Sequence, residues 1–97
     1  MQVQPATSGS CGGYGDPAND ACWHRLAQCE SGGNWAINTG NGYYGGLQFS
    51  LSSWRAEGGT GYPHQHSAAE QIARGRALHA QGGWRHWPGC SRSFGWI

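Results

Sequence analysis

Apolar side chains recur at helical spacing in the first third of the chain. Trp23, Leu26 and Ala27 fall at positions i, i+3 and i+4, which places them on one face of a helix. The predicted helix ends near Glu30, because Ser31-Gly32-Gly33 is a stop signal. Asp16-Pro17 fits its start, and there are two rival caps, Asn19 and Asp20.

Turn residues replace this pattern between Trp35 and Phe49. Residues 38–42 read Asn-Thr-Gly-Asn-Gly, which predicts a small hairpin with Tyr43 and Tyr44 on its returning arm. Gly45-Gly46 follows and lets the backbone come close to another element or to a ligand.

Two further helices and an aromatic tail complete the pattern. Residues 51–57 predict a short helix capped by Ser50, and Ser67 with Glu70 forms a capping box that starts a third helix. The expected apolar face of this third helix is Ala69, Ile72, Ala73, Ala77 and Ala80. We expect residues 84–90 to fold back onto the first helix. The fold class is α+β, mostly helical with one short β-hairpin.

A chain of 97 residues makes one small domain, and such domains often need disulfides. We expect a flexible N-terminal segment over residues 1–15 and a folded domain over residues 16–97. Four cysteines allow three pairings, and the absence of a C-x2-C pair favours disulfides over structural zinc. These cysteines are Cys11, Cys22, Cys29 and Cys90. Disulfides indicate an oxidising, extracellular setting.

Charge and hydropathy exclude several function classes. The net charge is +1 and the six arginines are scattered, so we expect no binding to nucleic acid. No apolar run is long enough to span a membrane, and Met1 starts no signal peptide, so we expect a mature fragment. His64 and His66 lack a third metal ligand, and we expect no metal and no cofactor. We expect a monomer.

Glu30 stands apart from other acids, since the nearest are Asp20 and Glu57. The negative end of a helix macrodipole and neighbouring apolar rings both favour a protonated carboxyl group. A protonated acid is what a donor to a glycosidic oxygen requires. The alternative is that Glu30 is an ordinary solvated residue at a helix end.

The residues around Glu30 suit a sugar, because sugar rings stack on aromatic faces and bind amides at their edges. Most glycosidases use two carboxyl groups, but the predicted hairpin has none, so the substrate would supply the nucleophile. Core packing is an alternative for every tryptophan. Candidate sugar contacts are Asn34, Asn38, Tyr43, Tyr44, Gln48, Trp54, Trp84 and Trp87.

One motif string is long and unusual in composition. It comprises Gln28-Cys29-Glu30-Ser31-Gly32-Gly33-Asn34-Trp35, then 37–49, and continues at Ser53-Trp54 and Trp87-Pro88. This string closely resembles the resuscitation-promoting factors of actinobacteria. The resemblance covers about residues 22–90 and implies a compact lysozyme-like fold, related to soluble lytic transglycosylases, that acts on the glycan strands of peptidoglycan.

The resemblance also implies roles for individual residues. The catalytic glutamate of the family falls on Glu30, its disulfide on Cys29 and Cys90, and its substrate groove on Ser53, Trp87 and Gln81. Two departures are Ser53, where the family often has Thr, and the segment 81–87, which looks one residue longer and puts Gln81 in doubt. A second disulfide between Cys11 and Cys22 lies outside the family pattern and is our own prediction.

The overall expectation is a secreted or cell-wall-associated enzyme that cleaves the bond between N-acetylmuramic acid and N-acetylglucosamine. We favour a lytic transglycosylase over a hydrolase, because no second carboxyl group is in view. The rival is a non-catalytic module that binds cell-wall fragments. The family also makes a cell-wall peptidase a candidate partner. The expected contacts are Glu30 as the catalytic acid and Asn38, Tyr43, Tyr44, Gln48, Ser53, Trp54, Gln81 and Trp87 as substrate-binding residues.

Overall fold

The first helix, α1 (Asp20–Ser31), supplies one wall of the core and ends beside the candidate acid. A computed structural model describes residues 10–97. The helix starts at the rival cap, since the side chain of Asn19 accepts a hydrogen bond from the backbone N–H of Ala21. A start at Asp16-Pro17 is therefore wrong. Gly32 closes the helix in the left-handed conformation (φ 67°), as predicted.

The two-stranded sheet differs from the predicted hairpin. Strand β1 (Tyr43–Tyr44) pairs antiparallel with β2 (Phe49–Ser50), so the tyrosines form the first arm and not the returning one. A single bridge between Asn38 and Tyr44 is what remains of the predicted pairing across residues 38–42. The tight turn lies downstream, at 45–48, where Gly45 and Gln48 both adopt positive φ.

Two helices follow with the predicted cap residues, although the capping box of the second is only half formed, because the carboxylate of Glu70 pairs with Arg74. The hydroxyl of Ser50 caps α2 (Leu51–Ala56), and the hydroxyl of Ser67 accepts from the backbone N–H of Glu70 at the start of α3 (Ala68–His79). A short 3-10 turn, η2 (Pro63–Gln65), lies between them.

The buried face of α3 matches the predicted apolar face at Ile72 but not at its alanines. Ala69, Ala73 and Ala80 are exposed, and the buried residues are Gln71, Ile72 and Gly75. A Cβ atom at Gly75 would lie 2.9 Å from both Leu47 Cδ1 and Trp23 Cζ3. The glycine therefore permits a close approach of α3 to the core, and this approach rotates the alanines toward solvent.

Gln71 connects α3 to the loop before β2. Its Oε1 accepts from the backbone N–H of Gly46 at 2.9 Å, and its Nε2 donates to the backbone carbonyls of Trp35 and His66. A fully buried amide whose groups are all bonded fixes the relative positions of the segments it joins. The Gly45-Gly46 pair therefore serves a close approach to another element, which was one of its two predicted roles.

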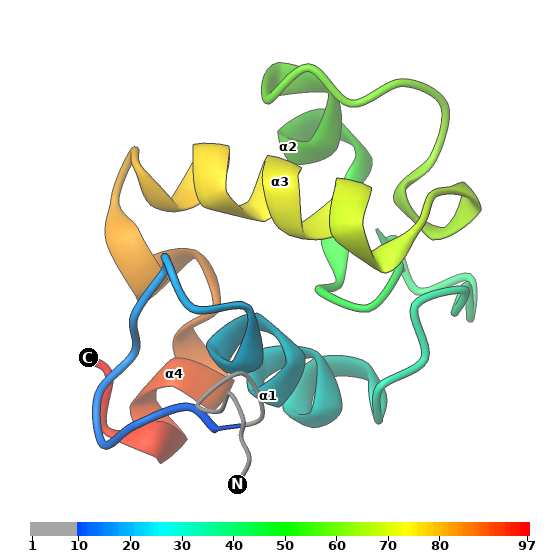
Figure 1. The fold of residues 1–97 in the computed structure, drawn as a ribbon. Helices are drawn as coiled ribbons and strands as arrows, with labels where there is room; N and C mark the ends of the chain where they lie inside the picture. The colour runs from blue at the N-terminus through cyan, green and yellow to red at the C-terminus, as the bar shows by residue number, and fades with distance from the viewer. Residues whose placement is uncertain (1–9) are drawn as a thin grey trace, which may run out of the picture.

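The C-terminal tail packs back against α1, as predicted. It contains a 3-10 turn, η3 (Gly83–His86), and a final helix, α4 (Pro88–Phe94), which lies beside α1 in Figure 1. Disulfide bonds join Cys29 to Cys90 and Cys11 to Cys22.

Residues 10–15 contact the folded domain through this second disulfide and through Gly15, whose carbonyl accepts from Trp84 Nε1 at 3.2 Å. The prediction of a flexible segment also covered residues 1–9, which lie outside the described residues.

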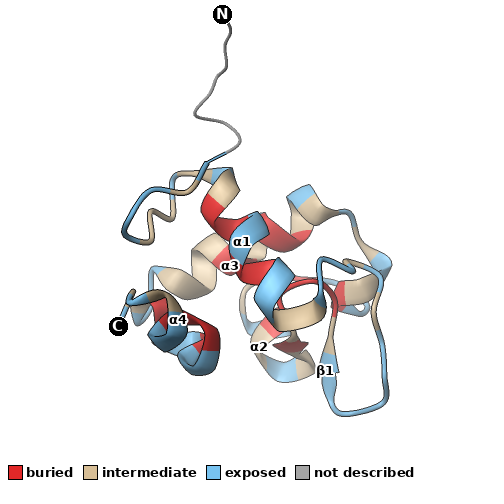
Figure 2. Cartoon of the chain, turned by 90° about the horizontal axis from the view of Figure 1, so that it is seen from below, coloured by how far each residue is buried: buried red, intermediate tan, exposed pale blue. Residues whose placement is uncertain are grey.

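Tryptophan rings dominate the core. Trp23 packs against Trp84 and Trp87 with ring centroids 4.7 and 5.3 Å apart. Buried positions concentrate on the facing sides of α1 and α3 and in the middle of α4 (Figure 2). The molecule is a small lysozyme-like α+β domain, mostly helical, with a short sheet and two disulfides. Within residues 10–97 no helix combines the length and hydropathy that a membrane crossing needs.

Candidate active site

Glu30 lines a cleft formed by α1, the sheet and the C-terminal tail. The cleft has a volume of about 400 Å³. An adjoining pocket of about 220 Å³ shares four of its lining residues, so the two are parts of one continuous groove. The shared residues are Tyr43, Gln48, His86 and Trp87.

Burial raises the pKa of Glu30 above the ordinary value for a glutamate. The residue sits in the last turn of α1, where the negative end of the macrodipole acts in the same direction, and no basic residue occupies that turn. Across the described residues no side chain hydrogen-bonds or ion-pairs with its carboxyl group. Both conditions favour a protonated carboxyl group, free to donate into the cleft.

Gln48 holds a strained backbone conformation in the same cleft. It has a φ of 55°, the one positive φ among the non-glycine residues described. Such a conformation costs an ordinary residue roughly 1–2 kcal/mol. The side-chain amide donates to the carbonyl of Gly45 at 3.0 Å, which helps hold the turn. Strain retained at a cleft is a reason to suspect function.

Trp87 forms part of the cleft wall and is itself fixed by the core. Its indole Nε1 donates to the carbonyl of Leu47 at 3.0 Å, and 4% of the residue is exposed. Tyr43, in contrast, is 50% exposed, so the tyrosine ring is available to a ligand. The cleft thus combines one rigid and one open aromatic ring.

The sequence-predicted site residues separate into two groups. Glu30, Tyr43, Gln48, Ser53 and Trp87 line the continuous groove. Asn38, Tyr44, Trp54 and Gln81 do not.

Trp54 is the clearest correction. Its side chain is fully buried, and its Nε1 donates to the carbonyl of Thr60 at 3.0 Å. It packs against Phe49 in the core and cannot contact a sugar in this structure. The prediction of a substrate contact at Trp54 is therefore wrong.

The other three outlying residues have local partners. Tyr44 packs its ring against Tyr62 and His64, and Asn38 accepts from the backbone N–H of Gly40 within the turn. Gln81 donates to the side chain of Glu57 at 2.7 Å. These contacts explain why three polar or aromatic side chains lie outside the groove.

Each of the other four carboxylates has a structural partner. Asp16 accepts from the backbone N–H of Ala18, and Glu57 accepts from Gln81. Two ion pairs account for the rest: Glu70 with Arg74 and Asp20 with Arg76. Glu30 is therefore the one carboxylate that lines the groove.

His86 lines both parts of the groove and was not predicted. Its Nε2 lies 3.1 Å from the carbonyl of Gln81, and its ring meets Trp87 edge-on at 6.0 Å. The one available signal in the sequence was the segment 81–87, which looks one residue longer than in the family that the chain resembles.

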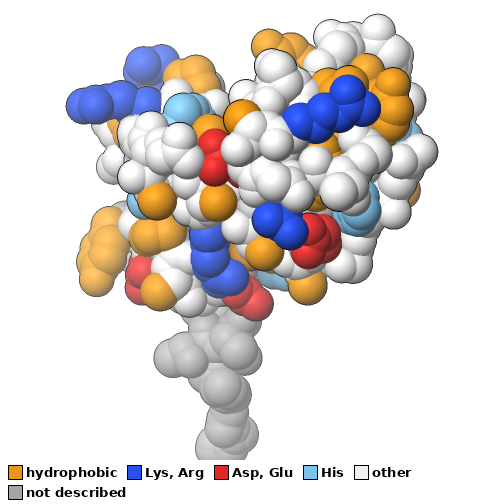
Figure 3. Space-filling view, turned by 90° about the horizontal axis from the view of Figure 1, so that it is seen from above, with side chains coloured by type: hydrophobic (Ala, Val, Ile, Leu, Met, Phe, Trp, Pro, Cys, Tyr) orange, Lys and Arg blue, Asp and Glu red, His pale blue; other side chains and the backbone are white. Residues whose placement is uncertain are grey.

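The described residues contain no group of three or more side chains suited to hold a metal ion. His64 packs between Tyr44 and Tyr62, and His66 Nε2 lies 2.7 Å from the carbonyl of Thr60. On the face shown in Figure 3, basic side chains lie in separate places and do not form one continuous patch.

The fold and the site together define a class of protein: a small lysozyme-like domain with one carboxyl group in an aromatic groove. The family of transglycosylase-like domains matches residues 17–90. The chain is 58% identical over 86 residues to the resuscitation-promoting factor Rpf of Micrococcus luteus, which covers 86% of this chain and 39% of that protein.

Two further relatives agree with this match. Resuscitation-promoting factor Rpf1 of Corynebacterium glutamicum is 58% identical over 80% of this chain and 42% of its own length. RpfE of Mycobacterium tuberculosis is 54% identical over 72% of this chain and 41% of its own length. The chain spans about two fifths of the length of these relatives. It belongs to the resuscitation-promoting factor family of transglycosylase-like domains.

Proposed function

We propose that this domain is a secreted glycosidase that cleaves peptidoglycan at the β-1,4 bond between N-acetylmuramic acid and N-acetylglucosamine. The observation that carries the proposal is Glu30, a carboxyl group with a raised pKa that stands alone in an aromatic groove. The names of the relatives, and their transglycosylase-like domain, favour this substrate over other glycans.

In the first step, Glu30 donates its proton to the glycosidic oxygen. The bond from the anomeric carbon of the muramyl residue to that oxygen breaks, and the glucosaminyl residue leaves as an alcohol. Burial and the helix terminus keep the proton on the carboxyl group until the leaving oxygen takes it.

In the second step, a nucleophile bonds to the anomeric carbon. An enzyme with a paired carboxylate would use that group or a water activated by it. The four other carboxylates have partners away from the groove, so we favour attack by the C6 hydroxyl of the muramyl residue itself. Glu30, now a carboxylate, accepts the hydroxyl proton, and the product carries a 1,6-anhydro ring. This is lytic transglycosylase chemistry.

The groove offers suitable contacts for the sugars. The ring of Tyr43 is open for stacking, and Gln48 and Ser53 offer an amide and a hydroxyl for the sugar edges. Trp87 provides a rigid wall, and His86 adds a donor or acceptor.

The biological setting follows the relatives. A resuscitation-promoting factor that remodels the cell wall acts outside the membrane, and two disulfides suit that compartment. We expect the domain to act as a monomer. A peptidase that cuts the peptide links of the same polymer is a reasonable partner.

Mass spectrometry of digested peptidoglycan tests the proposal directly. Anhydromuramic ends are expected from the wild type, and the Glu30→Gln variant should release none while still binding the polymer. Reducing ends would instead identify the enzyme as a hydrolase. An absence of products from the wild type would leave a binding module, the rival class.

A further inference from the structure

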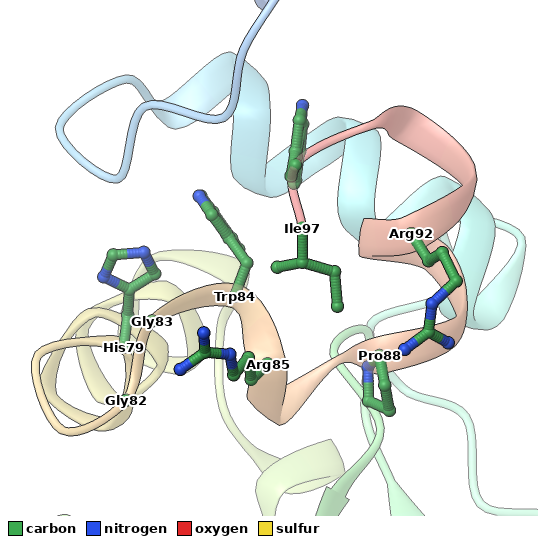
Figure 4. Close-up of a pocket in the computed structure, with 9 residues that line it drawn as sticks. His79, Gly82, Gly83, Trp84, Arg85, Pro88, Arg92 and Ile97 are labelled. Atoms are coloured by element: carbon green, nitrogen blue, oxygen red, sulfur yellow. The ribbon is translucent and has the colours of Figure 1, made fainter.

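A second, larger pocket lies on the other side of the C-terminal tail from Glu30. It has a volume of about 720 Å³ and shares only Pro88 with the Glu30 groove; Trp84, a candidate sugar contact from the sequence, lies in this pocket instead. Figure 4 shows its lining, with the side chains of Arg85 and Arg92 on either side of Ile97. The lining residues are His79, Gly82, Gly83, Trp84, Arg85, Pro88, Arg92, Trp96 and Ile97.

The two arginines of this pocket are unusual within the chain. Four of the six arginines have a partner: Arg74 and Arg76 form ion pairs, and Arg25 and Arg55 lie over aromatic rings. The remaining two line this pocket, and neither forms an ion pair or cation–π contact with any of residues 10–97.

The rest of the lining adds no acidic side chain to the two arginines. Burial, and then the charge of His86, lower the pKa of His79, so near neutral pH the positive charge comes from the arginines. Trp84 and Trp96, with ring centroids 4.5 Å apart, add apolar surface. Arginine paired with apolar surface suits a carboxylate carried on a partly apolar chain.

The pocket borders the Glu30 groove at one residue. Pro88, at the start of α4, lines both. A group attached to a sugar in the groove would have to pass Pro88 to reach the arginines.

We propose that this pocket binds the peptide side chain of peptidoglycan, with Arg85 and Arg92 holding its carboxylates. The proposal rests on the proposed function, because in that polymer the muramyl residue carries a short peptide with free carboxylates. A separate anionic wall polymer with phosphodiester groups would also meet the arginines. The shared wall at Pro88 favours the peptide, because a peptide attached to a sugar in the groove is held next to this pocket, whereas a separate polymer is not.

Binding measurements separate these possibilities. The protein carries Glu30→Gln so that ligands stay intact, and the probes are a glucosaminyl-muramyl disaccharide with its peptide and the same disaccharide without it. Isothermal titration gives both affinities. The double variant Arg85→Gln/Arg92→Gln is compared with Arg55→Gln, a matched change at an arginine outside the pocket. Both pocket arginines are exposed, so circular dichroism should show an unchanged fold.

We expect the preference for the peptide-bearing ligand to fall at least tenfold in the double variant and to stay unchanged in Arg55→Gln. An unchanged preference in the double variant would overturn the proposal. Polyglycerol phosphate could instead compete with the ligand in the wild-type pocket and not in the double variant, while the peptide makes no difference to affinity. That result would also overturn the proposal, in favour of a phosphodiester polymer. If wild-type protein releases nothing from peptidoglycan, the proposed function fails, whatever the binding result.

Discussion

The two disulfides connect different parts of the molecule, and breaking them one at a time separates fold stability from the geometry of the cleft. Cys29 precedes Glu30, and Cys90 lines the cleft. The Cys11–Cys22 bond touches neither part of the groove. Replacing the more exposed partner, Cys29→Ala or Cys11→Ala, breaks one bond and leaves the buried sulfur of Cys90 or Cys22 in the core.

The expected losses follow from the chain that each bond closes. The sequence separations are 61 residues for Cys29–Cys90 and 11 for Cys11–Cys22. Chain-entropy arithmetic converts these into stabilisation of about 4 and about 3 kcal/mol. Single domains are commonly stable by about 5–15 kcal/mol, so both variants should fold in the cold with clearly lower urea midpoints.

Activity should separate the two variants more than stability does. Where circular dichroism shows both folded, Cys29→Ala should release peptidoglycan fragments about 10–100 times more slowly, because shifts of about 1 Å near a reacting group carry such penalties. Cys11→Ala should keep wild-type rates. Equal activity losses, or a larger stability loss for Cys11→Ala, would refute the reasoning.

Three further predictions concern single side chains. Burial raises the folded-state pKa of Glu30, so its negative charge destabilises the fold at neutral pH. The Glu30→Gln variant should therefore unfold at a higher urea concentration than the wild type at pH 7, and this gain should vanish below the ordinary glutamate pKa. The same variant should cleave peptidoglycan at least 100-fold more slowly. Equal stability at both pH values would count against the buried carboxyl. Gln48→Gly relieves a positive φ but removes an amide, so stability should change by less than about 1 kcal/mol while activity falls; a large loss of stability would contradict this. Gly75→Ala should destabilise by about 1 kcal/mol or more through contacts with Trp23 and Leu47, whereas Gly89→Ala, in open space, should be neutral or stabilising.

Helix ends were predictable because they depend on neighbours in the sequence. Ser50 and Ser67 cap their helices through hydrogen bonds to residues three positions later, and Gly32 ends α1 by its own conformation. The start of α1 had several suitable caps, and the choice of Asn19 depended on geometry that the sequence does not contain.

The buried face of α3 was predictable only at Ile72, because the rest of it depends on residues far away in the chain. Alanine is weakly apolar and fits either side of a helix. Gly75 reads as a penalty in isolation, yet an added Cβ atom there would meet Trp23 and Leu47 at 2.9 Å. Gln71 reads as a surface residue, but two of its three hydrogen-bond partners, Gly46 and Trp35, come from segments that only the fold brings to it.

The candidate site shows the same limit. A tryptophan that stacks on sugars and one that fills a core have the same chemistry, so the sequence could not separate Trp54 from Trp87. The hydrogen bond of Trp54 to Thr60 turns it inward, whereas Trp87 borders the groove even though its indole is anchored to Leu47. His86 was missed because its position depends on how the segment 81–87 turns.

The isolation of Glu30 is stronger evidence about mechanism in the structure than it was in the sequence, because the structure places every other carboxylate side chain. In the sequence, isolation meant distance along the chain, and a distant acid could still have returned to the cleft. In the structure, a local turn bond at Asp16, two ion pairs and a bond from Gln81 to Glu57 hold the other four carboxylates elsewhere. Recruiting one of them would require breaking such a partnership and moving a helix end. An attacking hydroxyl carried by the substrate requires neither, which is the physical reason to favour the anhydro product.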